Sequence, residues 1–336
     1  MPEDHTPLPG VLPAVSEHAA KPKAFIVHDP IESGGLEFLL SAQSGMNLEE
    51  ALLFRERPNA DAYAIQYEAF VRTLSAHAAQ VLYLRDIVGD HPSYKATAKN
   101  PNQVFTRDSL ITIPWVPGGY ISARMKPPLR RAEAATMEAA ATLLGLREII
   151  RVPEELFLEG GDFVPFSREG RRTLLLGYGP RTRIETAHFL RRMLIPAYLD
   201  EIIALSLAHW RINLDGGLLP VAHNVVISDC KSILGATLMD EKGSYPIDIW
   251  DMFRSLGMTV INTTAEESMY FQSCNCLCLG GGKIIYYDMC TRVGDQLTDN
   301  GVTVHGISGS ELVKGRGGPR CMSRPLYCPV HTSRSG

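Results

Sequence analysis

Short β-rich runs alternate with helical segments along most of this chain of 336 residues. Apolar side chains from Tyr63 to Leu74 fall on one helical stripe, and the β-rich run Val81–Leu84 follows it. The Ala-rich segment Ala132–Leu144 and the segment Ile184–Leu194 predict further helices. This alternation predicts an α/β fold in which strands fix the positions of loops, and the loops carry the reactive groups.

The other expected elements are short and show no repeat in sequence. We expect a helix around Ile247–Leu256 and strands at Ala24–Val27, Ile111–Trp115, Thr173–Leu176, Asn224–Ser228, Met258–Ile261, Leu277–Leu279, Ile284–Tyr287 and Val302–His305. The glycine run Gly280–Lys283 lacks the Ser/Thr and the following helix of a phosphate-binding loop. Since it lies between two expected strands, we predict a hairpin turn there.

The chain is long enough to bury its own core, and its 45% hydrophobic and 21% charged residues are ordinary for a soluble globular protein. Prolines are frequent in residues 1–22, which predicts a flexible N-terminal arm, and we expect a frayed tail from Thr332 to Gly336. Length alone would allow two domains. We expect one catalytic domain over residues 23–330.

Charge and hydropathy exclude several classes of partner. The formal net charge of −4 leaves no basic excess for a phosphate backbone, so we expect no nucleic acid partner. No apolar stretch is long enough to span a bilayer, and residues 1–23 do not resemble a signal peptide. We therefore expect a cytoplasmic protein that does not bind membranes, and the sequence leaves a homo-oligomer open.

Seven cysteines, an odd number, do not resemble the disulfide framework of a small secreted protein, so we expect reduced thiols. Cys274, Cys276 and Cys278 alternate, and a strand would put them on one face. They could form a soft-metal site, but neither a CxxC pair nor a histidine cluster completes a ligand set. We favour packing in the core and predict no metal site.

Four polar segments can carry chemistry: Pro101–Asp108, Leu158–Asp162, Asn213–Gly217 and the Gly-rich Gly315–Ser323. Together they supply carboxylates, an amide, an aromatic ring and one cysteine. A guanidinium substrate needs this set, because the planar cation has five N–H donors and stays charged, so that acids hold it and a thiolate attacks it. We expect Arg316, Arg320 and the bound cation to favour ionisation of Cys321.

The motifs FTRD, EGGD, LDGG and GSELVKGRGGPRCMSRP resemble those of the arginine deiminases, within the guanidine-modifying (amidinotransferase/deiminase) superfamily. The similarity runs from about Lys23 to Pro329 and is most specific around Cys321. It implies a fivefold pseudosymmetric α/β propeller, the pentein fold. It also implies no metal or organic cofactor and a small arginine-like guanidino molecule as the partner.

The resemblance implies a role for each matching residue. Cys321 would be the nucleophile, Asp108 and Asp215 would grip the guanidinium nitrogens, and Glu159 would be the acid nearest the reacting carbon. Arg130 and Arg181 match the pair that binds the carboxylate of a free amino acid. The remaining positions of the substrate pocket match Asn102, Phe105, Asp162, Gly315 and Arg316. The implied reaction passes through a covalent thiouronium to a ureido product and ammonia, which from arginine would be citrulline and ammonia.

One position departs from the family pattern. The family has a catalytic histidine two residues before the third acid, where this chain has Asn213. A positioned general acid or base contributes about 10² to 10⁴ in rate, and an amide cannot titrate. His209 or His223 could replace it, the chemistry could differ, or the protein could bind without turnover. The alternatives to a deiminase are therefore an amidinotransferase or an arginine dihydrolase, both giving ornithine, and a non-catalytic arginine-binding homologue.

Overall fold

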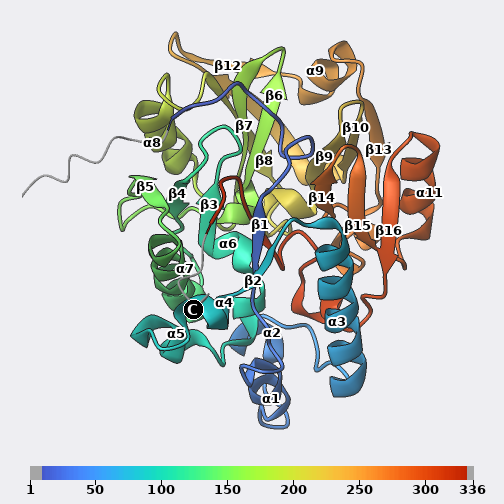
Figure 1. The fold of residues 1–336 in the computed structure, drawn as a ribbon. Helices are drawn as coiled ribbons and strands as arrows, with labels where there is room; N and C mark the ends of the chain where they lie inside the picture. The colour runs from blue at the N-terminus through green and yellow to red at the C-terminus, as the bar shows by residue number, and fades with distance from the viewer. Residues whose placement is uncertain (1–9, 331–336) are drawn as a thin grey trace, which may run out of the picture.

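The computed structural model describes residues 10–330 and shows a mixed α/β fold whose strands form five sheets (Figure 1). Four sheets have three strands and one has five. In sheet order, they comprise β17 (Arg324–Leu326), β1 (Ala24–Val27) and β2 (Val81–Tyr83); β3 (Leu110–Thr112), β4 (Gly119–Ser122) and β5 (Arg147–Ile150); β9 (Leu218–Ala222), β10 (Val225–Ser228) and β13 (Thr259–Asn262); β14 (Leu277–Gly280), β15 (Lys283–Tyr287) and β16 (Thr303–Ile307); and β6 (Phe163–Arg168), β7 (Arg171–Tyr178), β8 (Glu201–Leu207), β11 (Ile233–Met239) and β12 (Ser244–Ile247).

The same pairing occurs in all five sheets. In the sheet order given above, the first and second strands are antiparallel, and the second and third strands are parallel. Each parallel connection passes through at least one helix, as parallel strands require a long crossover. The five-stranded sheet continues this unit with the antiparallel strands β11 and β12.

The helices lie mostly around the outside of the strands (Figure 1). The α-helices are α1 (Gly35–Leu40), α2 (Leu48–Ala51), α3 (Ala60–His77), α4 (Leu84–Val88), α5 (Pro92–Thr97), α6 (Thr106–Ser109), α7 (Arg131–Leu143), α8 (Ile184–Leu194), α9 (Ile249–Ser255), α10 (Ala265–Tyr270) and α11 (Thr291–Asp299). Short 3₁₀ turns are η1 (Pro101–Val104), η2 (Pro128–Arg130), η3 (Gly160–Asp162), η4 (Leu214–Gly216), η5 (Cys230–Ser232) and η6 (Leu312–Gly315). None of the helices in residues 10–330 is long and apolar enough to cross a bilayer.

Local sequence explains the main helices. The apolar stripe predicted from Tyr63 to Leu74 is the buried face of α3, and the Asn59 side chain caps its first turn by accepting from the N–H of Ala62. The expected helix Ile184–Leu194 is α8. The expected helix Ile247–Leu256 begins two residues later than predicted, because Ile247 pairs in β12 and Asp248 caps α9.

Two other predictions concern residues near the carboxyl end. Gly280–Lys283 joins the antiparallel strands β14 and β15, as predicted for a hairpin, and Gly281 and Gly282 have positive φ. Of the three alternating cysteines only Cys278 lies in a strand, so the single strand face was wrong. All three are nevertheless buried in the largest apolar cluster, which confirms that they pack in the core.

The N-terminal segment is packed where it is described. Ser16, Glu17, His18 and Ala20 are buried, and the backbone N–H of Glu17 donates to the carbonyl of Pro165 in β6. These residues fall within the segment expected to be a flexible arm, whose first nine residues, like the tail from Thr332 to Gly336, lie outside the described residues. The division into an arm and one domain over 23–330 stays a prediction.

Candidate active site

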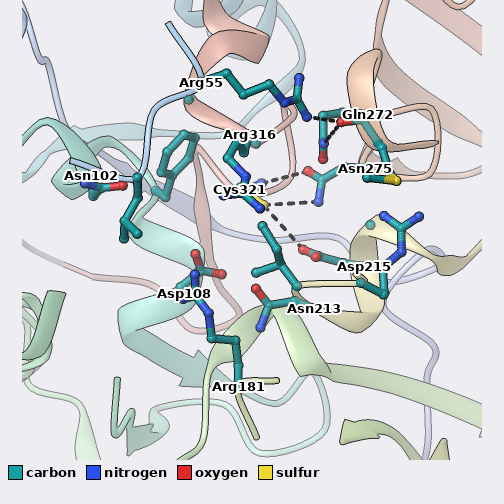
Figure 2. A pocket seen from close by; sticks show the side chains of 18 of the residues that line it. Arg55, Asn102, Asp108, Arg181, Asn213, Asp215, Gln272, Asn275, Arg316 and Cys321 are labelled. Carbon is teal, nitrogen blue, oxygen red and sulfur yellow. Dashed lines mark hydrogen bonds between the residues drawn. The ribbon is translucent and has the colours of Figure 1, made fainter. Parts of the chain in front are cut away.

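Chemically distinctive residues immediately precede the first strand of each sheet. Asp108 lies in α6 before β3, Asp215 in η4 before β9, Asn275 before β14 and Cys321 before β17. These four line one cavity of about 200 Å³. The fifth segment, η3 before β6, contains Asp162 and lies directly behind the cavity wall. The repeated pairing of the five sheets thus brings together residues that are far apart in the chain (Figure 2).

Most of the residues predicted for the site line this cavity. They are Asn102, Phe105, Asp108, Arg130, Arg181, Asn213, Asp215, Gly315, Arg316 and Cys321. The other two, Glu159 and Asp162, are buried and do not line it. Both accept hydrogen bonds from the side chain of Asn213. The structure therefore places ten predicted residues around one space and two immediately behind it.

Cys321 is held from two sides (Figure 2). Nδ2 of Asn275 donates to its Sγ over 3.1 Å, and Oδ1 of Asn275 accepts from the backbone N–H groups of Gly318 and Cys321, each at 3.2 Å. The thiol in turn donates to Oδ2 of Asp215 over 3.5 Å. One amide side chain thus fixes both the sulfur and the backbone of the Gly-rich loop.

The thiol of Cys321 has a pKa well above its usual value. Burial is the largest cause, the carboxylates of Asp215 and Asp108 add to it, and Arg320 and the Asn275 hydrogen bond oppose it. The prediction that Arg320 favours ionisation is confirmed in direction, and the same expectation for Arg316 stays a prediction. Arg320 does lower the pKa but is outweighed, and Arg316 pairs with Glu49 at 2.6 Å. Burial and these carboxylates thus favour the neutral thiol over the thiolate.

Two carboxylates, Asp215 and Asp108, face the sulfur, and they differ in how many hydrogen bonds they accept. Oδ2 of Asp215 accepts a hydrogen bond from Nη1 of Arg320 at 2.8 Å. Burial raises the pKa of Asp215, and the opposing effect of Arg320 is smaller. Oδ2 of Asp108 accepts from Nη1 of Arg130 at 2.7 Å. Oδ1 of Asp108 is buried and has no hydrogen-bond partner among the described residues. A buried carboxylate oxygen without a donor is a favourable position for a cationic ligand.

The two arginines predicted to bind a carboxylate are both ion-paired. Arg130 is buried, and its donors reach Asp108, both oxygens of Glu133 and the carbonyls of Asn102 and Phe105. Arg181 pairs with Glu159 through Nη1, at 3.1 and 3.2 Å. Their role in binding a carboxylate stays a prediction, and it requires these ion pairs to exchange partners.

Asn213 occupies the position of the missing histidine. Its Nδ2 donates to Asp162 at 2.9 Å and to Glu159 at 3.2 Å. Burial raises the pKa of Asp162 to about 8, and the nearby Glu159 adds to this rise. The hydrogen bonds from Thr182 and Asn213 lower the pKa but do not offset the rise. His209 and His223 are both exposed and do not line the cavity, although His209 packs edge-on against Trp210, which does.

A buried ion network lies behind the cysteine and was missed by sequence reasoning. Glu17 accepts from Arg107 at 3.2 Å and from Nη2 of Arg320 at 2.8 Å, and Arg320 also holds Asp215. Burial raises the pKa of Glu17, but Arg320 and Arg107 outweigh it and lower the pKa to about 2. Arg107 and Arg320, which are next to Asp108 and Cys321 in sequence, are therefore both paired with Glu17 of the N-terminal segment.

Asn275 was also missed, since its neighbours Cys274 and Cys276 drew attention to packing. Its position before the first strand of a sheet, like that of Asp108 and Asp215, is the signal that could have identified it. Residues 10–330 contain no group of three or more His, Cys, Asp or Glu side chains placed to hold a metal ion.

Solved structures with the same fold are known. The chain superposes on unliganded AgrE with a TM-score of 0.66 at 18% identity, over 92% of this chain and 40% of that one. It matches the N-terminal domain of ArgZ, a cyanobacterial arginine dihydrolase with product bound, with a TM-score of 0.65 at 16% identity, over 91% and 99%. A dimethylarginine dimethylaminohydrolase adduct gives 0.62 at 20% identity, over 91% and 100%.

Sequence comparison gives the family. The arginine deiminase of Borrelia duttonii (strain Ly) is 27% identical over 257 residues, which are 67% of this chain and 61% of that protein. The arginine deiminase of Staphylococcus aureus (strain JH9) is 53% identical over 53 residues, 16% of this chain and 13% of that protein. This chain thus spans less than two thirds of the length of these relatives. Residues 88–328, most of the chain, match the family model described as arginine deiminase, and the chain belongs to that family.

Proposed function

We propose that this protein is a cysteine-dependent guanidine-modifying hydrolase of the arginine deiminase type, acting on free arginine or a close analogue. The observation that carries the proposal is the shared cavity of Cys321, Asp215 and Asp108, with one buried Asp108 oxygen that has no donor among residues 10–330. A guanidinium group has the charge and the N–H donors to satisfy both carboxylates while its carbon faces the sulfur.

Substrate binding would generate the reactive thiolate. The cation offsets the charges of Asp108 and Asp215, which raise the pKa of Cys321 in the empty site. The proton passes from sulfur to Asp215, which already accepts the thiol hydrogen bond. The thiolate then attacks the guanidinium carbon and forms a tetrahedral adduct.

Asp215 also provides a route around the missing histidine. In this proposal it returns the proton from the thiol to the departing nitrogen, so that ammonia leaves and a thiouronium remains on Cys321. Asp215 then accepts a proton from water, whose oxygen attacks the same carbon. The C–S bond breaks, the hydroxyl proton of the adduct passes to the sulfur to restore the thiol, and Asp215 gives its proton to the released ammonia, which leaves the ureido product. Asn213 would hold Glu159 and Asp162 beside this site without transferring a proton.

The other predicted residues keep the roles that the resemblance implies. A zwitterionic substrate would replace the Asp108–Arg130 ion pair with two new ones, since its guanidinium meets Asp108 and its carboxylate meets Arg130. Arg181 would likewise release Glu159 and bind the substrate carboxylate. Such an exchange leaves neither Asp108 nor Arg130 without a partner, which limits its cost in free energy. The remaining proposed contacts are Asn102, Phe105, Asp162, Gly315 and Arg316.

The product mixture from arginine tests the proposal. Citrulline with one equivalent of ammonia supports deimination. Ornithine that forms only with an added amine indicates an amidinotransferase, and ornithine with two equivalents of ammonia indicates a dihydrolase. Saturable binding without product indicates an arginine-binding homologue. The Cys321→Ala variant should form no product, and unchanged turnover in that variant would refute the assigned nucleophile.

We also propose that the five sheets form a fivefold pseudosymmetric propeller within one domain over residues 23–330. The common pairing of the sheets and the position of one site segment before each first strand support this arrangement. In such a propeller equivalent segments meet near the central axis. That position would explain why residues from all the sheets surround the same substrate.

A further inference from the structure

Five arginines line the cavity, and four of them pair with a carboxylate. These pairs are Arg130 with Asp108, Arg181 with Glu159, Arg211 with Asp229 and Arg316 with Glu49. The fifth, Arg55, has no ion pair among residues 10–330. The cavity therefore has one guanidinium whose charge is not balanced by a paired acid.

Arg55 is nevertheless held in position. Its backbone N–H donates to the carbonyl of Lys314 at 2.9 Å. Its guanidinium lies 4.7 Å from the centre of the Tyr270 ring, and its Nη2 donates to the carbonyl of Met269. These contacts orient the group without neutralising it.

The surroundings of Arg55 favour an anion. The side chain is half-buried, and burial together with the nearby Arg316 lowers its pKa more than Tyr270, Glu49 and Glu56 raise it. In Figure 2 Arg55 and Asp108 lie on opposite sides of Cys321. A ligand with a cationic end at Asp108 and an anionic end at Arg55 would match both.

We propose that Arg55 acts with Arg130 and Arg181 in binding the carboxylate of the substrate, and that it sets the preference for guanidino acids over guanidino amines. This inference rests on the proposed function and goes beyond it, because Arg55 lies outside every motif that matches the family. Unlike Arg130 and Arg181, Arg55 needs no exchange of an ion pair to receive the carboxylate.

The test compares arginine with agmatine, which has the same guanidino chain without the carboxylate. kcat/KM is measured for both with the wild type, Arg55→Met, Arg55→Lys and Arg57→Met. Arg57 is a matched control in the same loop, since it donates to the carbonyls of Ala42 and Gln43 and does not line the cavity.

We expect Arg55→Met to reduce the preference for arginine by about tenfold or more, through loss of activity on arginine with agmatine turnover unchanged. Arg55→Lys should retain part of the preference and Arg57→Met all of it. An unchanged preference in Arg55→Met, or an equal loss for both compounds, would overturn the inference.

Calorimetric dissociation constants for both compounds separate this inference from the proposed function. If the wild type binds arginine without turnover, the proposed function fails, and the ratio of the two constants in Arg55→Met still decides the role of Arg55. If the wild type binds neither compound, both proposals fail.

Discussion

Glu17 should stabilise the folded chain by about 3 kcal/mol at neutral pH, although it lies outside every recognised motif. Its pKa falls from 4.5 to about 2 in the folded state, because the attraction of Arg320 and Arg107 exceeds the penalty of burial. At about 1.4 kcal/mol per pKa unit the shift corresponds to roughly 3 kcal/mol. That magnitude matches the roughly 3–5 kcal/mol lost when one partner of a buried ion pair is removed.

The sign of the pH dependence follows from the lowered pKa. The stabilisation is fully present above the unfolded pKa of 4.5 and is lost as the pH falls through the folded pKa of about 2. Glutamine keeps the shape but does not titrate. The free energy of unfolding of wild type should therefore exceed that of Glu17→Gln by about 3 kcal/mol at pH 7, and by roughly half as much at pH 3.

Denaturant unfolding at a series of pH values measures this difference. Glu32→Gln is the control, because Glu32 forms an exposed ion pair with Arg85 at 2.6 Å. Its loss should change the free energy of unfolding by less than about 1 kcal/mol. A Glu17→Gln difference that matches this control, or that is as large at pH 3 as at pH 7, would refute the account of the buried network.

Two further predictions concern the chemistry of the site. Asn213→His should raise the rate of citrulline formation by about 10² or more, because it restores a titratable group beside Glu159 and Asp162; steady-state kinetics measure the rate, and an unchanged kcat would show that proton transfer through this position does not limit turnover. Alkylation of Cys321 by iodoacetamide should require a higher pH than alkylation of an ordinary cysteine in the free protein and should move to lower pH in Asp215→Asn, because the carboxylate raises the thiol pKa. Asn275→Ala should move the alkylation profile the other way, since the amide hydrogen bond lowers that pKa; mass spectrometry of the labelled peptide follows each profile, and identical profiles in all three proteins would contradict the assigned contacts.

Local sequence patterns predicted which segments form helices and strands better than they predicted the residues at which those helices and strands end. The stripe of Ile184–Leu194 coincides with α8, because an amphipathic period is a property of the segment itself. The expected strand Val81–Leu84 ends one residue early, since Leu84 starts α4. Strand ends depend on hydrogen bonds to a neighbouring strand, and a single sequence does not show that neighbour.

The site residues also fall into those that a local motif identifies and those whose role depends on a partner distant in the chain. Asp108 and Cys321 were predicted because each lies in a short motif whose chemistry is readable without the fold. Glu17 was missed because its partner Arg320 is 303 residues away in the chain, and Asn275 because its partner Cys321 is 46 residues away. The raised pKa of the thiol was missed too, because burial and the approach of two carboxylates exist only after folding.

The pairing of β17 with β1 has a consequence for biosynthesis. The strand that follows Cys321 joins a sheet whose other two strands, β1 and β2, come from the first hundred residues, and Ala24 lies opposite Leu326. A nascent chain on the ribosome can form most of its sheets while this edge is still vacant. The loop that carries Cys321 can therefore be fixed by this sheet only after synthesis has passed Leu326.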